Sequence, residues 1–231
     1  MAGLALFGSK NPVPLDPGKE IRVLEQAIYS TLSYITHAHL LCYRFPAVLT
    51  PTDQAKAQTM SDAVQVASAI TPLPASMQQN ATVMGYNSDG ELVMLREGSN
   101  EMMCLADIPG DERFHVACYD KRLDPFMSRG RALSAEGKGR QESRDIRQAE
   151  IEAGTLSIPD GPAALYQLFG GPTSLNTETG EVSEVNPLYV VYIPYATPES
   201  TGIGEDAPMP GAPWLMDAGL PWAHIMYAPS R

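Results

Sequence analysis

The chain has 231 residues, a formal net charge of -11 and a sequence pI near 4.7. Apolar residues make up 44% and charged residues 19%, a balance typical of globular proteins and not of disordered chains. The excess of carboxylates argues against a nucleic-acid partner, because affinity for phosphate backbones comes largely from Lys and Arg. No apolar run reaches the 18 or so residues of a membrane span, so we expect a chain that does not cross a membrane.

The N-terminal part predicts one amphipathic helix. Between residues 19 and 45, apolar side chains recur every three or four positions, which places them on one helical face. Prolines bound this segment on both sides, and residues 50–80 are typical of a linker with a short helical patch at 59–69. We therefore predict an N-terminal helix and linker at 1–73 and a core domain at 74–231. The apolar positions are Ile21, Leu24, Ile28, Leu32 and Ile35.

The start of the chain does not look like a secretory signal. Residues 1–16 contain a single Lys and no adequate apolar region. Residues 40–49 are moderately apolar, and Ala55 and Ala57 have the small-x-small spacing of a cleavage site. This stretch is consistent with a degenerate export signal or with an ordinary amphipathic helix followed by a linker.

From residue 81 the pattern changes to short strands and turns. Two apolar-rich runs, 81–86 and 91–96, flank Asn87-Ser88-Asp89-Gly90, which predicts a β-hairpin because Asp-Gly tolerates positive φ. Further strands are expected at 102–106, 114–119, 163–169, 188–195, 214–216 and 223–227. The run at 188–195 is the most apolar and β-branched of these, so we expect it to be the central strand.

A long charged segment at 124–153 predicts two helices with a break near Gly137. From Lys121 to Arg147 its cations alternate with carboxylates, which is typical of a solvated helix face. Strands and helices do not alternate regularly along the chain. The fold class we expect is therefore α+β, with a mainly antiparallel sheet, the N-terminal amphipathic helix and this central charged helical segment.

The chain has three cysteines, Cys42, Cys104 and Cys118. The last two lie in neighbouring predicted strands across a turn, where a disulfide could close. In the chain-entropy model, a bridge over a loop of about 15 residues stabilises by roughly 3 kcal/mol. Two buried free thiols are the alternative. Metal binding is disfavoured because no C-x2-C pair exists, and a disulfide would indicate an oxidising compartment.

Several short motifs lie within residues 74–228, namely Ala81–Met84, Leu95–Asn100 with Cys104, Cys118, Tyr192–Ala196, Pro213–Gly219 and Ala223–Met226. With these motifs, the segment resembles a group of uncharacterised bacterial proteins that often begin with signal peptides. The resemblance rests on several short motifs taken together and excludes the N-terminal segment. It implies a shared fold and a periplasmic or secreted location, and it brings no known activity.

No well-known catalytic or nucleotide-binding motif occurs in the chain, including the nucleophile elbow, the zincin motif, the P-loop and the Rossmann fingerprint. One catalytic arrangement is conceivable, because a serine hydroxyl becomes nucleophilic beside an imidazole that a carboxylate orients. Its members would be His224, Asp217 and Ser99 or Ser174. His224 lies in an apolar strand, so a hydrogen-bonded core histidine is the simpler interpretation.

Aromatic side chains around the Pro- and Gly-rich segment 196–213 suggest a binding surface instead. Such rings stack on sugars, organic ligands or cations, although ordinary core packing explains them equally well. The candidate ligand-binding residues are Trp214, Trp222, Tyr192, Tyr195 and His115.

The sequence therefore predicts an exported α+β domain that binds a small molecule or a component of the cell envelope. A small hydrolase of esterase or amidase type is the alternative, and a purely structural envelope protein is a third reading. We expect no cofactor and no metal, and the sequence leaves the oligomeric state open.

Overall fold

The computed structural model describes residues 60–229, and the helix predicted between residues 19 and 45 lies outside this range. No helix in the described range is long and apolar enough to cross a membrane. In chain order the elements are α2 (Asp62–Ala69), α3 (Ala75–Gln78), β1 (Thr82–Tyr86), β2 (Leu92–Arg96), β3 (Met102–Leu105), β4 (Phe114–Asp120), the 3-10 helix η1 (Lys121–Leu123), α4 (Asp124–Ala135), α5 (Arg140–Glu152), β5 (Ala163–Gly170), β6 (Asn186–Tyr192), α6 (Pro198–Thr201), β7 (Trp214–Met216) and β8 (His224–Tyr227).

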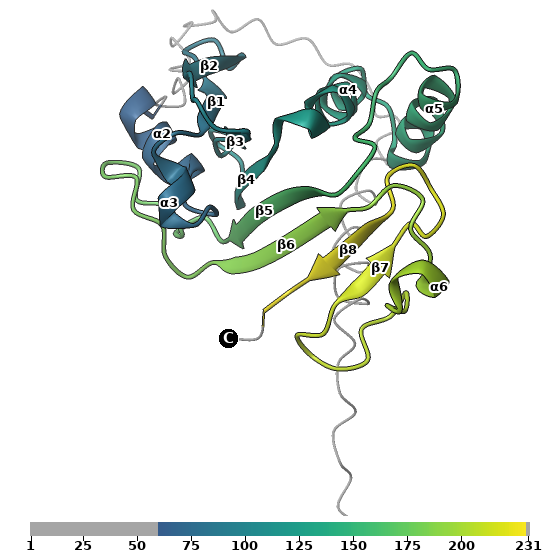
Figure 1. The fold of residues 1–231 in the computed structure, drawn as a ribbon. Coiled ribbons are helices and arrows are strands. Elements are labelled where there is room, and N and C mark those ends of the chain that lie inside the picture. Colours follow the sequence, from purple (N-terminus) through teal and green to yellow (C-terminus); the bar gives the residue numbers. More distant parts are fainter. Residues whose placement is uncertain (1–59, 230–231) are drawn as a thin grey trace, which may run out of the picture. The chain divides into compact units, whose positions relative to one another are not determined.

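The strands form one sheet in the order β2-β1-β3-β4-β5-β6-β8-β7 (Figure 1). Every neighbouring pair is antiparallel except β1 and β3, which are parallel. The predicted α+β class with a mainly antiparallel sheet is confirmed for the described residues. The β1–β2 hairpin is also confirmed. Its turn is closed by Asn87, whose Oδ1 accepts hydrogen bonds from the N–H groups of Asp89 and Glu91, and by Gly90 at φ 78°.

The prediction that segment 188–195 is the central strand is wrong. The corresponding strand, β6, lies inside the sheet between β5 and β8, but the middle of the sheet is formed by β4 and β5. Only Val190 and Tyr192 are buried in β6, whereas five of the seven residues of β4 are buried. Apolar composition alone did not separate these strands, because both are rich in apolar residues and composition does not show which positions pack in the core.

Side chains of β4 alternate between two separate parts of the core. Ala117 and Tyr119 face the helices α4 and α5, where they pack with Leu123 and Phe126. Cys118 faces the opposite side and packs in a second cluster to which α2 and the α3 region contribute. Figure 1 shows α2 and α3 beside the β1–β3 end of the sheet and α4 and α5 nearer its middle.

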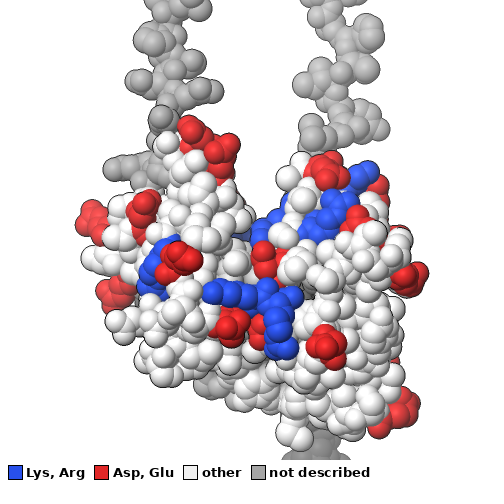
Figure 2. Space-filling view, turned by 45° about the horizontal axis from the view of Figure 1, so that its top comes forward, with Lys and Arg blue, Asp and Glu red and all other residues white. Residues whose placement is uncertain are grey.

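The helical segment 124–153 divides where the sequence predicts. Gly137 adopts φ 77°, a left-handed conformation that ends α4 with little strain. Arg129 then joins the two helices, because its guanidinium donates to both carboxylate oxygens of Glu150 at 2.7 to 2.9 Å. Figure 2 shows Lys and Arg side chains gathered near the middle of one face, with Asp and Glu side chains among them.

The helix α2 lies within the helical patch predicted at 59–69, and one side of it packs in the core. Ser61 begins the helix by accepting a hydrogen bond from the N–H of Val64. Gln65 is fully buried, and its side-chain amide pairs with both the N–H and the C=O of Tyr86 at 2.7 and 2.9 Å. The Gln65 side chain thus makes the two hydrogen bonds to the backbone of Tyr86, at the end of β1, that a neighbouring strand would otherwise make.

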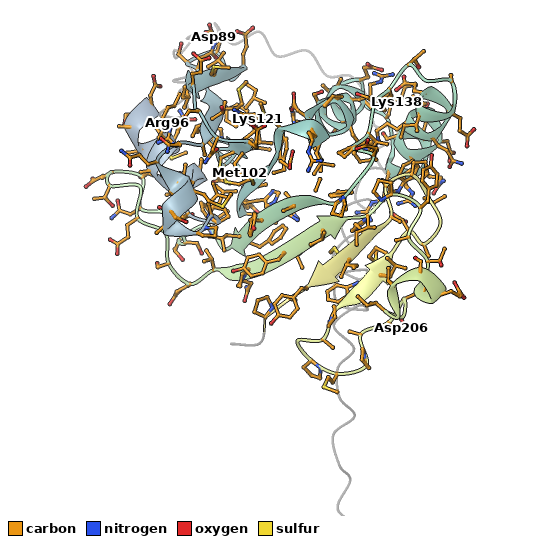
Figure 3. The ribbon with its side chains drawn as sticks, viewed as in Figure 1. Asp89, Arg96, Met102, Lys121, Lys138 and Asp206 are labelled. Carbon is orange, nitrogen blue, oxygen red and sulfur yellow. A yellow bond between two sulfur atoms is a disulfide. The ribbon has the colours of Figure 1, made fainter. Side chains whose placement is uncertain are left out.

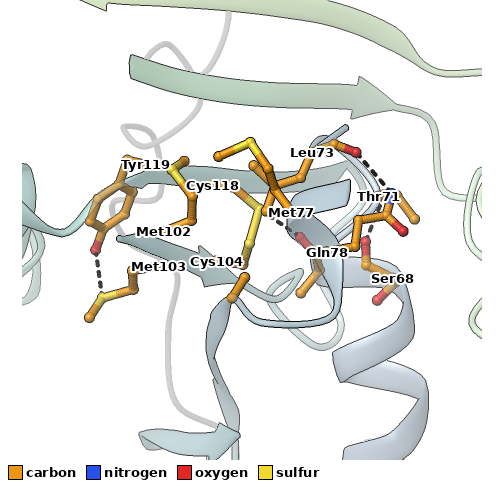
Figure 4. The surroundings of a disulfide bond; sticks show 12 residues. Ser68, Thr71, Leu73, Met77, Gln78, Met102, Met103, Cys104, Cys118 and Tyr119 are labelled. Carbon is orange, nitrogen blue, oxygen red and sulfur yellow. Dashed lines mark hydrogen bonds between the residues drawn. A yellow bond between two sulfur atoms is a disulfide. The ribbon is translucent and has the colours of Figure 1, made fainter. Parts of the chain in front are cut away.

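Cys104 and Cys118 form a disulfide, as the strand spacing predicts. They face each other directly in the β3–β4 ladder with their Cα atoms 3.9 Å apart. Both are fully buried, and Figure 4 shows Leu73 and Met77 beside the bridge. The disulfide therefore links the two strands on either side of the loop at residues 106–113.

Candidate functional site

Asp217 is the centre of a polar cluster that the sequence only partly anticipates. Both of its carboxylate oxygens accept hydrogen bonds from Arg144, at 2.6 and 3.0 Å, and Oδ2 also accepts from Nε1 of Trp222 at 2.9 Å. The Arg144 guanidinium lies 5.4 Å from the centre of the Trp222 ring. The cluster thereby joins α5 to the turn between β7 and β8.

The electrostatics of this cluster favour a permanently charged pair. Burial alone would raise the pKa of Asp217, but the hydrogen bonds and charge of Arg144 outweigh it and hold that pKa below its ordinary value. The hydrogen bond to Asp217 likewise raises the pKa of Arg144. Arg147 also turns inward, with its guanidinium 4.2 Å from the centre of the Phe126 ring. The prediction of a wholly solvated helix face is therefore wrong for these two arginines.

The structure does not assemble the Ser, His and Asp arrangement. His224 is bonded through Nδ1 to the backbone oxygen of Trp222 at 2.8 Å, and Asp217 is bonded to Arg144 and Trp222. Ser99 precedes β3, four strand positions from β8 in the sheet, which corresponds to roughly 19 Å. The alternative Ser174 is buried and bonds within its own loop, to Gly171 and Glu184.

Two of the five predicted ligand-binding residues lie in the core. Trp222 and Tyr192 are 3% and 8% exposed, and both pack against Phe126. Burial raises the pKa of Tyr192 to about 12, so its hydroxyl stays protonated. They are therefore structural neighbours of Asp217 and do not form a binding platform.

The other three predicted ligand-binding residues are accessible but separate. Trp214 is half-buried in β7, and Tyr195 is 59% exposed at φ 60° in the segment after β6. His115 lies in β4, where its ring stacks on Phe169 with the centroids 4.4 Å apart. Its Nε2 is 2.9 Å from Oε1 of Gln167, and desolvation of the ring lowers the pKa of His115. Of these three residues, His115 is connected to a cavity through its backbone N–H, which donates to Asp107 in the cavity wall.

That cavity, which we call the Asp107 pocket, has a volume of about 330 Å³. One wall is the β3–β4 loop, which contributes Asp107 and Arg113 and ends at Phe114. The opposite wall is the segment from Gly171 to Thr177, which follows β5, and it contributes Leu175 to the pocket. The Asp107 pocket thus lies between two connections that are distant in sequence and adjacent in the sheet.

Local hydrogen bonds hold both walls. Asn176 closes a turn by accepting from the N–H groups of Glu178 and Thr179, and Leu175 bridges to Val182. Gly180, at φ 77°, lies against α2 so closely that a Cβ atom there would crowd Ala67. In the opposite loop, Asp107 Oδ1 accepts from the N–H of His115 at 2.8 Å. Hydrogen bonds therefore hold the backbone on both sides of the pocket.

Asp107 carries the most perturbed carboxyl in this region. Burial raises its pKa to about 6, and the negative charge of Asp111 adds to the rise, while the backbone N–H groups of His115 and Ile108 oppose it. No Lys or Arg side chain forms an ion pair with Asp107 among residues 60–229. The Asp107 carboxylate is therefore partly removed from solvent, and no cationic side chain in the described range compensates its charge.

Arg113 presents the opposite charge in the same pocket. Its backbone N–H donates to Asp111 Oδ1 at 2.8 Å, which fixes the loop. Its guanidinium makes no hydrogen bond or ion pair within the described part of the chain. The pocket therefore combines an uncompensated carboxyl, an available guanidinium and the apolar side chains of Phe114, Leu175 and Met60.

Sequence reasoning missed the Asp107 pocket. The segment Pro109-Gly110-Asp111 looks like an ordinary turn, and Gly110 does adopt φ 84°. The closely spaced charges Asp107, Asp111 and Arg113 between two strands were the only available signal. Nothing in the sequence indicates that residues 171–177 would close the other side.

Among residues 60–229, no group of three or more His, Cys, Asp or Glu side chains is arranged to hold a metal ion. Comparison of the chain with protein-family models, with curated proteins and with solved structures found no match.

Proposed function

We propose that this domain is a noncatalytic binding protein that takes a small organic molecule into the Asp107 pocket. The observation that carries the proposal is the pairing of a cavity of about 330 Å³ with a half-buried carboxyl that has no cationic partner among the described residues. Ligand sites are typically concave and mostly apolar, with a few polar groups that orient the ligand. The volume is at the lower end of the usual range, about 300 to 1,000 Å³, and therefore suits a small ligand.

We further propose that the protein works in the periplasm or outside the cell. The disulfide between Cys104 and Cys118 supports this location, because such bonds persist in oxidising compartments and are rare in the cytosol. A role in binding an envelope component is compatible with the same location. The reduction state of the protein recovered from its native cell would test it, since a reduced Cys104–Cys118 pair would contradict export.

Binding can be tested by blocking the Asp107 pocket. Gly171 lines it, has space for a side chain and does not have a positive φ, so Gly171→Phe should fold and fill the cavity. Gly161→Phe is a matched control, because Gly161 also has open space and precedes the other end of β5. We expect small organic fragments to shift the amide NMR signals of Asp107, Arg113 and Leu175 in the wild type and in Gly161→Phe.

In Gly171→Phe those shifts should be lost while the rest of the spectrum is retained. If no fragment in a chemically varied set moves the signals of the pocket in the wild-type chain, the proposed function is wrong. If fragments move them equally in Gly171→Phe, they bind elsewhere, and the pocket is not the site.

A further inference from the structure

We propose that the ligand of the Asp107 pocket is a small zwitterion, with an ammonium group that pairs with Asp107, a carboxylate that pairs with Arg113 and an apolar side chain between them. Free amino acids and the ends of short peptides belong to this chemical class. The inference rests on the proposed function and specifies its ligand.

The ammonium half follows from the surroundings of Asp107. One of its oxygens already accepts the N–H of His115 at 2.8 Å, which orients the carboxyl in the loop. An ammonium group has three donors, so it can bond to the remaining carboxylate lone pairs and supply the missing positive charge. The pKa of about 6 at Asp107 is consistent with a carboxylate whose charge has no local compensation.

The carboxylate half follows from Arg113. A guanidinium presents paired N–H donors in a planar fork that matches the two oxygens of a carboxylate. In residues 60–229 this group has no protein partner, although Asp111 lies in the same loop and is held by the backbone N–H of Arg113. A ligand carboxylate can therefore bind Arg113 without first displacing a protein side chain from that part of the chain.

The remaining charges favour a zwitterion over a simple anion. Asp111 adds negative charge near Asp107, and His115 has a lowered pKa, so it is mainly neutral at pH 7. With one guanidinium against two carboxylates, an anion without an amine would be repelled by Asp107 and Asp111. A cation without a carboxylate would leave Arg113 unpaired and close to another positive charge.

The apolar lining accounts for the middle of the ligand. Phe114 is buried, and Met60 and Leu175 are half-buried where they line the pocket. A branched aliphatic or aromatic side chain would bury apolar surface there, and the volume of about 330 Å³ suits a small ligand group. All three kinds of side chain line the same pocket, whose volume suits one ligand of amino-acid size.

Four probes that share one side chain separate these contributions. Leucine carries both charges, leucine amide only the ammonium, N-acetyl-leucine only the carboxylate, and N-acetyl-leucine amide neither. Each probe is titrated into the full-length protein at pH 7.5, and binding is measured by calorimetry and amide NMR. Leucine should have the highest affinity. Loss of either charge should weaken binding by about tenfold to a hundredfold, because each removes one charge-assisted contact.

Two substitutions connect each charge to its residue. Asp107→Asn keeps an oxygen for the N–H of His115 and should fold, but it should weaken leucine binding and leave N-acetyl-leucine almost unaffected. Arg113→Gln should weaken leucine and leave leucine amide almost unaffected. Asp206→Asn and Lys138→Gln are the charge-matched controls. Figure 3 shows Asp206 in the loop before β7 and Lys138 at the turn between α4 and α5.

The outcomes separate this inference from the proposed function. If N-acetyl-leucine amide binds in the pocket as tightly as leucine, or if leucine amide or N-acetyl-leucine matches leucine, the zwitterion is wrong and the binding role stands. The same holds if none of the four binds while other fragments shift the signals of the pocket. If no probe or fragment binds there, both proposals fail.

Discussion

Asp217 and Asp107 are both partly buried carboxyls in loops, yet their surroundings differ in almost every respect. Asp217 receives two hydrogen bonds from Arg144 and one from Trp222, and its pKa lies below the ordinary value. Asp107 receives the N–H of His115, and its pKa is raised to about 6. The first carboxyl has a cation in contact with it, and the second has none among the described residues.

This difference distinguishes a cluster that holds the fold together from one that costs stability. The Asp217 cluster is complete, because its charge and its neighbouring donors are satisfied by the protein itself. At Asp107 the protein retains a poorly compensated charge inside a cavity, which lowers stability unless a ligand offsets it. Residues that cost stability in the free protein are candidates for function, and this contrast can be tested by substitution.

The largest expected effect comes from the disulfide, which joins the two strands that carry the Asp107 loop. Replacing Cys104 and Cys118 with Ser should lower the free energy of unfolding by about 3 kcal/mol, the chain-entropy value for a loop of this length. Urea denaturation of the wild type and the double variant measures the change. Hydrogen exchange should rise in residues 106–113 more than around Asp217.

A thiol titration provides the control for this experiment. Unfolded, unreduced wild-type protein from an oxidising compartment should show one free thiol, from Cys42, and the double variant should show the same number. Three free thiols in the wild type would contradict the disulfide and remove the main support for export.

The second effect concerns the completed cluster. Asp217→Ala should destabilise by about 2 kcal/mol, because it leaves Arg144 and the Trp222 N–H without their shared partner in a partly buried site. Asp217→Asn should cost less, since an amide oxygen still accepts from Trp222 and Asn tolerates φ 56°. Thermal or urea unfolding distinguishes the two variants. Equal stability of all three proteins would show that the cluster contributes nothing measurable.

Local signals account for the parts of the fold that the sequence predicts. The hairpin turn at Asn87–Gly90 and the helix break at Gly137 depend on backbone conformations that their own residues prefer. The pairing of Cys104 with Cys118 follows from two strands that are adjacent in sequence. In each case the interacting groups are separated by few residues, so spacing and residue type are sufficient.

The parts that sequence reasoning missed depend on contacts between distant segments. Arg144 and Asp217 are 73 residues apart, and no pattern in the helix distinguishes this arginine from its solvated neighbours. Gln65 pairs with the backbone of Tyr86 in another element. The Asp107 pocket requires that residues 171–177 face the β3–β4 loop, which follows only from the pairing of β4 with β5.

The smallest expected effect has the opposite sign and concerns Asp107. Its pKa is about 6 in the folded protein and near 3.9 when unfolded, so the folded state binds more protons between these values and loses stability as the pH rises. Asp107→Asn removes this loss, and at pH 7.5 it should stabilise the free protein by about 1 kcal/mol after allowance for solvent screening.

The stabilisation by Asp107→Asn should disappear near pH 4, where the native carboxyl is protonated and neutral like the amide. Asp206→Asn, at an exposed position, should show no such dependence on pH. Urea unfolding of the three proteins at pH 4 and pH 7.5 provides the measurement. If Asp107→Asn is instead destabilised at pH 7.5, the ionised carboxyl stabilises the fold as Asp217 does. The contrast between the two sites would then be lost, together with the reason for expecting a cation in the pocket.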